Sequence, residues 1–161
     1  MSTLHLVCGL PCSGKTTFAK TLEQEHHALR LTPDEWHVCL FGQDAADDGY
    51  YGDVHTERHS AIEAMLWQVA ARVLSLGTNV VLDFGFWSRV ERDDFRSRAA
   101  DLGAGFKLYY LEVPNDELLA RLTKRNAHLP PGTFFIEPAQ MKEWFSIFEP
   151  PTLEELGKNT S

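Results

Sequence analysis

The chain has 161 residues and a net charge of −8, and its content of 43% hydrophobic and 24% charged residues fits one folded domain with a sizeable core. Nucleic-acid binding requires clustered Lys and Arg, so 15 basic residues against 23 acidic ones argue against a stable nucleic-acid partner. No apolar run approaches the roughly 20 residues that span a bilayer, so we expect no membrane partner. The three cysteines are odd in number and lack metal-like spacing, which predicts a cytoplasmic protein. The N-terminus lacks a basic n-region and a separate apolar h-region, so we expect no signal peptide.

Short apolar runs alternate with helix-like stretches along the chain. The apolar runs predict strands at residues 4–8, 28–31, 79–83 and 106–113. The other stretches predict helices at residues 14–25, 34–41, 54–76, 88–102, 116–127 and 140–148. We expect Thr32 and Asn115 to cap two of these helices, and Ser88 with Glu91 to form a capping box. Residues 42–53 are rich in Asp and Gly and predict an exposed loop. This alternation predicts a parallel sheet covered by helices.

A complete phosphate-binding motif, G-x-x-x-x-G-K-S/T, lies between the first predicted strand and the helix after it. It comprises Gly9, Leu10, Pro11, Cys12, Ser13, Gly14, Lys15 and Thr16, with Thr17 following. Backbone N–H groups of such a loop and the N-terminus of the next helix hold a triphosphate. We expect Lys15 to bind the β- and γ-phosphates and the Thr16 hydroxyl to ligate Mg²⁺. The motif thus predicts ATP, or alternatively GTP, with Mg²⁺ as cofactors.

Two aspartates follow predicted strands, where ligands collect in open α/β sheets. Asp34 follows the second strand and is positioned to accept the proton of an attacking hydroxyl. Alternatively, it only stabilises the N-terminus of the next helix. Asp83 ends the third strand and is predicted to hold Mg²⁺ or to orient the acceptor. A purely structural turn is the alternative for Asp83.

Aromatic residues next to these aspartates suggest a pocket for the acceptor. We predict Trp36, His37, Phe86 and Trp87 as its walls, together with the segment around residues 50–59. The aromatic residues near Asp83 could equally belong to the core.

Arg121 and Arg125 are four residues apart on one predicted helix and therefore share a face. Pro130, Pro131 and Gly132 follow as a hinge, so residues 121–133 predict a lid whose guanidinium groups close over the transferring phosphates. The alternative is a solvated basic face.

His55 and His59 are also four residues apart, but the sequence reveals no third metal ligand, and surface or substrate-contact roles are favoured. Cys12 lies in the phosphate loop near a helix N-terminus, a position that can lower the pKa of a thiol, but the favoured interpretation is a small residue that the loop tolerates.

These residues together resemble the P-loop kinases related to zeta toxin, polynucleotide kinase and chloramphenicol phosphotransferase, a group that includes small bacterial "AAA family ATPase" proteins. The resemblance covers about residues 4–148. It implies a three-layer α/β P-loop NTPase of the nucleotide-kinase type with a short helical lid, a domain at residues 1–150 and a polar tail at 151–161. Within the family pattern, Asp34 corresponds to the base, Asp83 to a second aspartate, and Arg121 and Arg125 to the lid arginines.

The chain departs from that pattern at two positions. Cys12 replaces the glycine usual in the family loop, and His37 stands where polynucleotide kinases carry an arginine for the acceptor's phosphate. We therefore predict a monomeric or homodimeric kinase that transfers the γ-phosphate of Mg·ATP to a hydroxyl of a small metabolite or antibiotic. The alternatives are a P-loop ATPase or nucleotide-dependent switch without an acceptor, and a toxin-type kinase of nucleotide sugars.

Overall fold

A single parallel sheet forms the centre of the computed structural model, which describes residues 1–47 and 49–157. Its strands are β1 (Thr3–Cys8), β2 (Leu29–Leu31), β3 (Val80–Gly85) and β4 (Gly105–Tyr110). They lie in the order β2-β3-β1-β4, and every neighbouring pair is parallel. All four strands predicted from the sequence are present, which confirms the parallel α/β fold.

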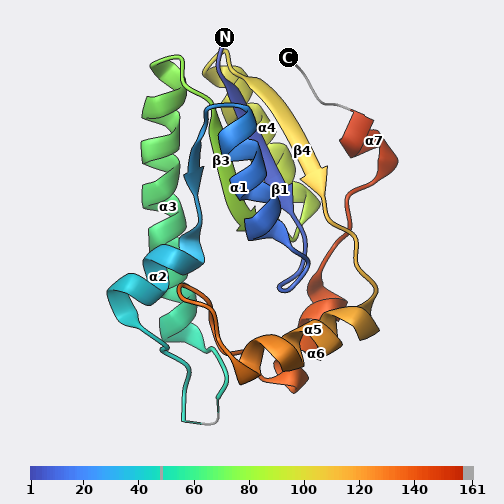
Figure 1. Cartoon of the computed structure of the whole chain (residues 1–161). Coiled ribbons are helices and arrows are strands. Elements are labelled where there is room, and N and C mark those ends of the chain that lie inside the picture. Colours follow the sequence, from blue (N-terminus) through green and yellow to red (C-terminus); the bar gives the residue numbers. More distant parts are fainter. Residues whose placement is uncertain (48, 158–161) are drawn as a thin grey trace.

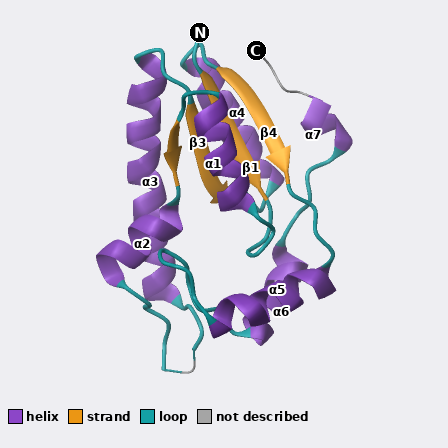
Figure 2. Cartoon of the chain, viewed as in Figure 1, coloured by secondary structure: helices purple, strands orange, loops and turns teal. Residues whose placement is uncertain are grey.

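Helices cover both faces of this sheet (Figure 1). They are α1 (Lys15–Glu25), α2 (Pro33–Phe41), α3 (Asp53–Ser75), α4 (Arg89–Asp101), α5 (Asn115–Ala127), α6 (Pro138–Ile147) and the short α7 (Leu153–Gly157). Figure 2 shows α1 in front of the sheet, with α5 and α6 beyond the ends to which the strand arrows point. The carboxyl ends of the strands therefore face α5 and α6.

Side-chain alternation in β1 divides the core into two layers. Leu4 and Leu6 pack on one face with residues of α3 and α4, whereas Val7 packs on the other face with Ala19 and Leu22 of α1. Because successive side chains of a strand point to opposite faces, a strand covered on both sides is apolar at nearly every position. This explains why short apolar runs predicted the sheet.

A third apolar cluster joins the phosphate loop to the lid segment. Leu10 of the loop packs with Leu118 and Leu122 of α5 and with Met141 of α6. The predicted lid at residues 121–133 therefore starts inside α5, and its helix is anchored on the loop that it faces.

The C-terminal segment, predicted only as a polar tail, carries α7 and a fully buried ion pair. Arg92 of α4 and Glu155 of α7 have no exposed side-chain surface, and Arg92 Nε donates to Glu155 Oε1 over 2.8 Å. Arg92 Nη1 also donates to the carbonyls of Phe86 and Glu149, over 3.0 and 2.9 Å. This guanidinium therefore ties α7 to the chain segment that leaves β3.

The capping predictions had mixed outcomes. Ser88 Oγ accepts from Glu91 N at the start of α4, which confirms Ser88 as the cap. The cap predicted at Asn115 is wrong, because α5 begins at Asn115 itself and Pro114 occupies the cap position. Thr32 does precede α2, but its side chain forms no capping hydrogen bond.

Candidate active site

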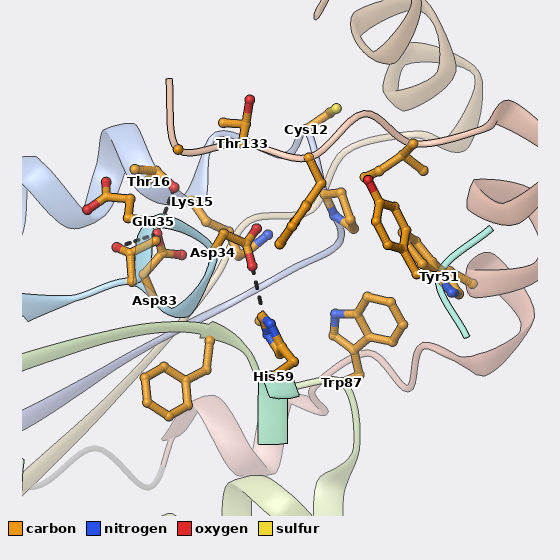
Figure 3. A pocket seen from close by; sticks show the side chains of 18 of the residues that line it. Cys12, Lys15, Thr16, Asp34, Glu35, Tyr51, His59, Asp83, Trp87 and Thr133 are labelled. Atoms are coloured by element: carbon orange, nitrogen blue, oxygen red, sulfur yellow. Dashed lines mark hydrogen bonds and ion pairs between the residues drawn. The ribbon is translucent and has the colours of Figure 1, made fainter. Parts of the chain in front are cut away.

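A cavity of about 780 Å³ opens at the carboxyl ends of β1 and β3, where the strand order places the phosphate loop. The phosphate loop, the first turns of α1 and α2, the end of β3, α3, α5 and residues 130–134 supply its walls. This volume lies within the range of about 300–1,000 Å³ typical of small-molecule sites. Figure 3 shows side chains from these separate segments converging on one space.

The phosphate loop is shaped by residues with left-handed backbone conformations. A Cβ at Gly9 would lie 2.7 Å from Ser13 Oγ and 3.2 Å from the Leu111 carbonyl oxygen, so only glycine fits there. Cys12 also adopts a positive φ of 66°. Lys15 Nζ donates to the Leu10 carbonyl over 2.9 Å and thus lies across the loop.

The predicted nucleotide-binding residues divide into two groups. Pro11, Cys12, Gly14, Lys15, Thr16 and Thr17 line the cavity. Gly9, Leu10 and Ser13 are buried and form the turn beneath it. The first group therefore supplies the surface that a phosphate would touch, and the second holds the loop in shape.

Asp83 and Thr16 meet at the base of the cavity (Figure 3). Thr16 Oγ1 donates to Asp83 Oδ2 over 2.7 Å, and Thr32 Oγ1 donates to the same oxygen over 3.2 Å. The carboxylate is 5% exposed, and Oδ1 has no hydrogen-bond partner. Burial is the main reason why the pKa of Asp83 is raised, although Lys15 and Thr16 act in the opposite direction.

This donor set fits Mg²⁺. Magnesium prefers hard oxygen ligands, and a Thr hydroxyl beside a carboxylate is what P-loop proteins offer it. Oδ1 of Asp83, a residue that lines the cavity, is buried without a hydrogen-bond partner and adds a further oxygen to this set. The Thr32 contact was missed by sequence reasoning, which assigned Thr32 only to a helix cap.

Asp34 lies in the first turn of α2 and lines the same cavity, with its side chain 52% exposed. His59 Nε2 of α3 is 3.8 Å from Asp34 Oδ1 and 3.4 Å from Glu63 Oε1 (Figure 3). Burial alone would lower the pKa of His59, but the Glu63 hydrogen bond and the charge of Asp34 raise it overall. The imidazole beside the predicted base therefore takes up a proton more readily than a free histidine does.

The two arginines of α5 also line the cavity. Arg121 Nη1 donates to the Cys12 carbonyl over 3.3 Å, and Arg125 Nη2 donates to the Phe134 carbonyl over 2.9 Å. Arg125 Nε is buried without a hydrogen-bond partner. Arg121 thus contacts the phosphate loop directly, whereas Arg125 contacts the segment that follows α5.

The four predicted acceptor residues separate in the structure. Phe86 and Trp87 line the cavity, whereas Trp36 and His37 are absent from its walls. Trp36 is 47% exposed and His37 is fully buried. Four other aromatic residues also line the cavity: Tyr51, Phe84, Phe134 and Trp144. Tyr51 and Phe84 lay in segments that sequence reasoning marked, whereas nothing local distinguishes Phe134 and Trp144 from core aromatics.

The thiol of Cys12 is less acidic than that of a free cysteine. Burial raises the pKa of Cys12 and outweighs the nearby positive charges of Arg125 and Lys15. The position of Cys12 near a helix N-terminus therefore does not lower the pKa of its thiol.

Among the described residues, no helix combines the length and apolar character needed to cross a membrane.

Comparison with solved structures reveals the same fold in several proteins. A candidate kinase from Chloroflexus aurantiacus J-10-fl has a TM-score of 0.71 at 19% identity, covering 94% of this chain and 82% of its own. APS kinase CysC of Mycobacterium tuberculosis, solved with AMPPNP and APS, has a TM-score of 0.61 at 19% identity, covering 99% and 85%. A chain of the Pnkp1/Rnl/Hen1 RNA repair complex has a TM-score of 0.67 at 23% identity, covering 90% of this chain but 43% of its own.

No functionally curated protein matches the chain by sequence. The sequence pattern of one family, AAA_33, described as an AAA domain, matches residues 4–151. This match includes the phosphate loop, both aspartates and both lid arginines, and the fold is that of P-loop kinases. The chain therefore belongs to the AAA_33 family of AAA domains.

Proposed function

We propose that this protein is an ATP-dependent kinase that transfers the γ-phosphoryl group to a hydroxyl of a small molecule. One observation carries the proposal: the cavity that the phosphate loop lines is also lined by Asp34 and by several aromatic side chains. A nucleotide switch needs only the phosphate loop. Asp34 and the aromatic lining supply the carboxylate and the space that an acceptor requires.

In this proposal the phosphate loop binds the triphosphate, and Lys15 turns from the Leu10 carbonyl to the β- and γ-phosphates. Mg²⁺ held by Thr16 and Asp83 would neutralise charge on the β- and γ-oxygens. Asp34 accepts the proton of the acceptor hydroxyl as its oxygen bonds to the γ-phosphorus. The bond between that phosphorus and the β–γ bridging oxygen breaks, and ADP leaves with the electron pair. Arg121 and Arg125 stabilise the charge on the transferring group.

The aromatic part of the cavity lining supports a neutral acceptor with an apolar body. Aromatic surface comes from Tyr51, Phe134, Trp87 and Trp144. The carboxylates of Asp34, Glu35 and Glu63 also line the cavity and would repel an anionic acceptor such as a nucleic-acid end. We therefore propose a small hydroxylated metabolite or antibiotic as the acceptor, and a monomer or homodimer in the cytoplasm as the working form.

The test is acceptor profiling with Mg·ATP labelled on the γ-phosphate, using hydroxylated metabolites, nucleosides and antibiotics. Asp34→Asn is compared with wild type, and Asp116→Asn is the matched control because it also changes a first-turn aspartate, on α5, outside the cavity. General bases contribute about 10²–10⁴-fold, so we expect at least about a 100-fold loss of turnover only in Asp34→Asn.

Two results would contradict the proposal. A loss below about tenfold in Asp34→Asn would exclude Asp34 as the base. Label released only as inorganic phosphate, at equal rates in wild type and Asp34→Asn, would instead indicate an ATPase or switch.

A further inference from the structure

Three histidines from two helices meet beside the cavity, although the sequence reveals only a pair. His55 and His59 lie one turn apart on α3, and His37 of α2 packs against both. One ring nitrogen from each residue lies within 4.8 Å of the other two. His37 Nδ1 and His59 Nδ1 are 3.1 Å apart. The fold thus supplies the third imidazole that spacing alone did not show.

Carboxylates fix the ring nitrogens of these histidines. Asp44 accepts from His37 Nε2 over 2.9 Å and from His55 Nδ1 over 2.6 Å. A carboxylate only accepts hydrogen bonds, so both of these nitrogens carry the proton. In the neutral rings, His37 Nδ1 and His55 Nε2 then carry the lone pairs. Glu63 stands in the same relation to His59 Nε2, at 3.4 Å.

This pattern is how proteins prepare histidines as metal ligands. A metal-binding imidazole usually donates its second N–H to a carboxylate, which sets the tautomer and makes the other nitrogen more basic. Here one aspartate serves two histidines and Glu63 serves the third. Arg58 Nη1 also donates to Asp44 Oδ2 over 3.1 Å and holds the shared carboxylate in place.

The distances suit a transition metal better than Mg²⁺. Zinc–nitrogen bonds of about 2.0–2.1 Å in a tetrahedral site separate the two nitrogens by about 3.3 Å, close to the His37–His59 spacing of 3.1 Å. All ligand atoms lie within 4.8 Å of one another, so no pair has to close by more than about 1.5 Å to reach this spacing. Imidazole nitrogen favours Zn²⁺, Ni²⁺, Co²⁺ and Cu²⁺, whereas Mg²⁺ takes oxygen.

The surroundings of the cluster restrict water. The side chains of His37, His55 and Asp44 are 0%, 14% and 8% exposed. The Phe134 ring contacts His37 and His55 edge-on, at centroid distances of 5.0 and 4.9 Å. An apolar shell of this kind limits solvent access to a metal centre.

We propose that His37, His55 and His59 form a binding site for one divalent transition-metal ion of the Zn²⁺ class. The site is separate from the Thr16–Asp83 pair and is independent of the kinase proposal. The metal takes the lone pairs of all three imidazoles, and the proton on His59 Nδ1 passes to solvent. Because His37 lies on α2 and the other two on α3, the bound ion joins these helices directly behind Asp34.

The test uses the full chain without a polyhistidine tag, freed of metal by a chelator and dialysed into excess Mg²⁺. Co²⁺ is titrated with visible absorption as the readout, and Zn²⁺ by calorimetry. We expect one equivalent, a dissociation constant of about 1 µM or tighter, and a rise in Tm. Loss of a ligand in His55→Gln or His59→Gln is expected to weaken binding at least about 100-fold, and Asp44→Asn about 10–100-fold.

His128→Gln is the matched control, because His128 is exposed and lies outside the cluster. The partly exposed His55 and His59 are changed rather than the fully buried His37, and circular dichroism confirms that each variant is folded. Wild-type affinity in either His55→Gln or His59→Gln would overturn the three-histidine site. Binding weaker than about 1 mM in folded wild type, or equal weakening in His128→Gln, would also overturn it.

Discussion

Substituting Glu155 by Gln should destabilise the protein strongly, although it changes one carboxylate in a segment that looks like a polar tail. The Arg92 guanidinium is completely buried, and among the described residues Glu155 is the carboxylate that forms an ion pair with it, through contacts of 2.8 and 3.3 Å. Removing one partner of a buried ion pair leaves an uncompensated charge and costs about 3–5 kcal/mol. For a chain of this size that corresponds to a fall in Tm of about 6–20 °C.

Thermal denaturation at pH 7 measures this change. Glu154→Gln is the matched control, because Glu154 is 64% exposed and pairs with Arg89 at 3.8 Å. Exposed pairs contribute about 0–1 kcal/mol, so the control should lower Tm by at most about 4 °C. A Tm for Glu155→Gln within about 2 °C of wild type would show that the pair is not the anchor inferred here.

The pH dependence gives a second check on the same pair. Burial would raise the pKa of Glu155, but the Arg92 hydrogen bonds and the Thr152 N–H lower it to about 2. A lowered carboxyl pKa means that the contribution to stability is complete above the ordinary value of 4.5 and is lost as the pH falls towards 2. The difference in Tm between wild type and Glu155→Gln should therefore shrink over that interval.

Two other substitutions test the cavity. Burial, with repulsion from Glu63, raises the pKa of Glu91 to about 7, so folded wild type loses stability as the pH rises from about 4.5 to 7. The Tm of Glu91→Gln should exceed that of wild type at pH 8 but not at pH 4. An equal difference in Tm at the two pH values would refute the raised pKa of Glu91. Cys12→Gly should keep Tm within a few degrees, because relief of its positive φ offsets the entropy of glycine. Maleimide treatment should leave nucleotide binding intact in Cys12→Gly, whereas Cys39→Ser should not have this protection.

The sequence predicted the parts of the molecule in which local pattern and tertiary role coincide. The apolar runs around Leu4 and Val80 are buried on both faces, so their pattern marks them as central strands. The phosphate loop likewise depends on glycines at fixed positions, which the sequence displays directly. The AAA_33 match, the parallel sheet and the kinase-like fold confirm these predictions.

Contacts between distant segments could not be predicted in this way. Thr32 resembles a helix cap in sequence, but its hydroxyl donates to Asp83, 51 residues away. Glu155 resembles a solvated residue of an acidic tail, and only the fold shows its partner 63 residues earlier. His37 resembles a wall of the acceptor pocket, yet Asp44 and the histidines of α3 enclose it. In each case a polar side chain is paired with a residue of another segment, and the periodicity of apolar residues along the sequence does not reveal such a pairing.

The Arg92 guanidinium also couples the docking of the C-terminal helix α7 to the aromatic wall of the cavity. It donates to the Phe86 carbonyl, and Glu149 N donates to the Trp87 carbonyl over 2.9 Å, so the aromatic wall and the docked α7 share one set of bonds. By thermodynamic linkage, any molecule that binds more tightly to the wall when α7 is docked strengthens the docking by the same free energy. Binding of such a molecule in the cavity then increases the protection of the C-terminal segment from hydrogen exchange and proteolysis, and docking of α7 increases the affinity for that molecule.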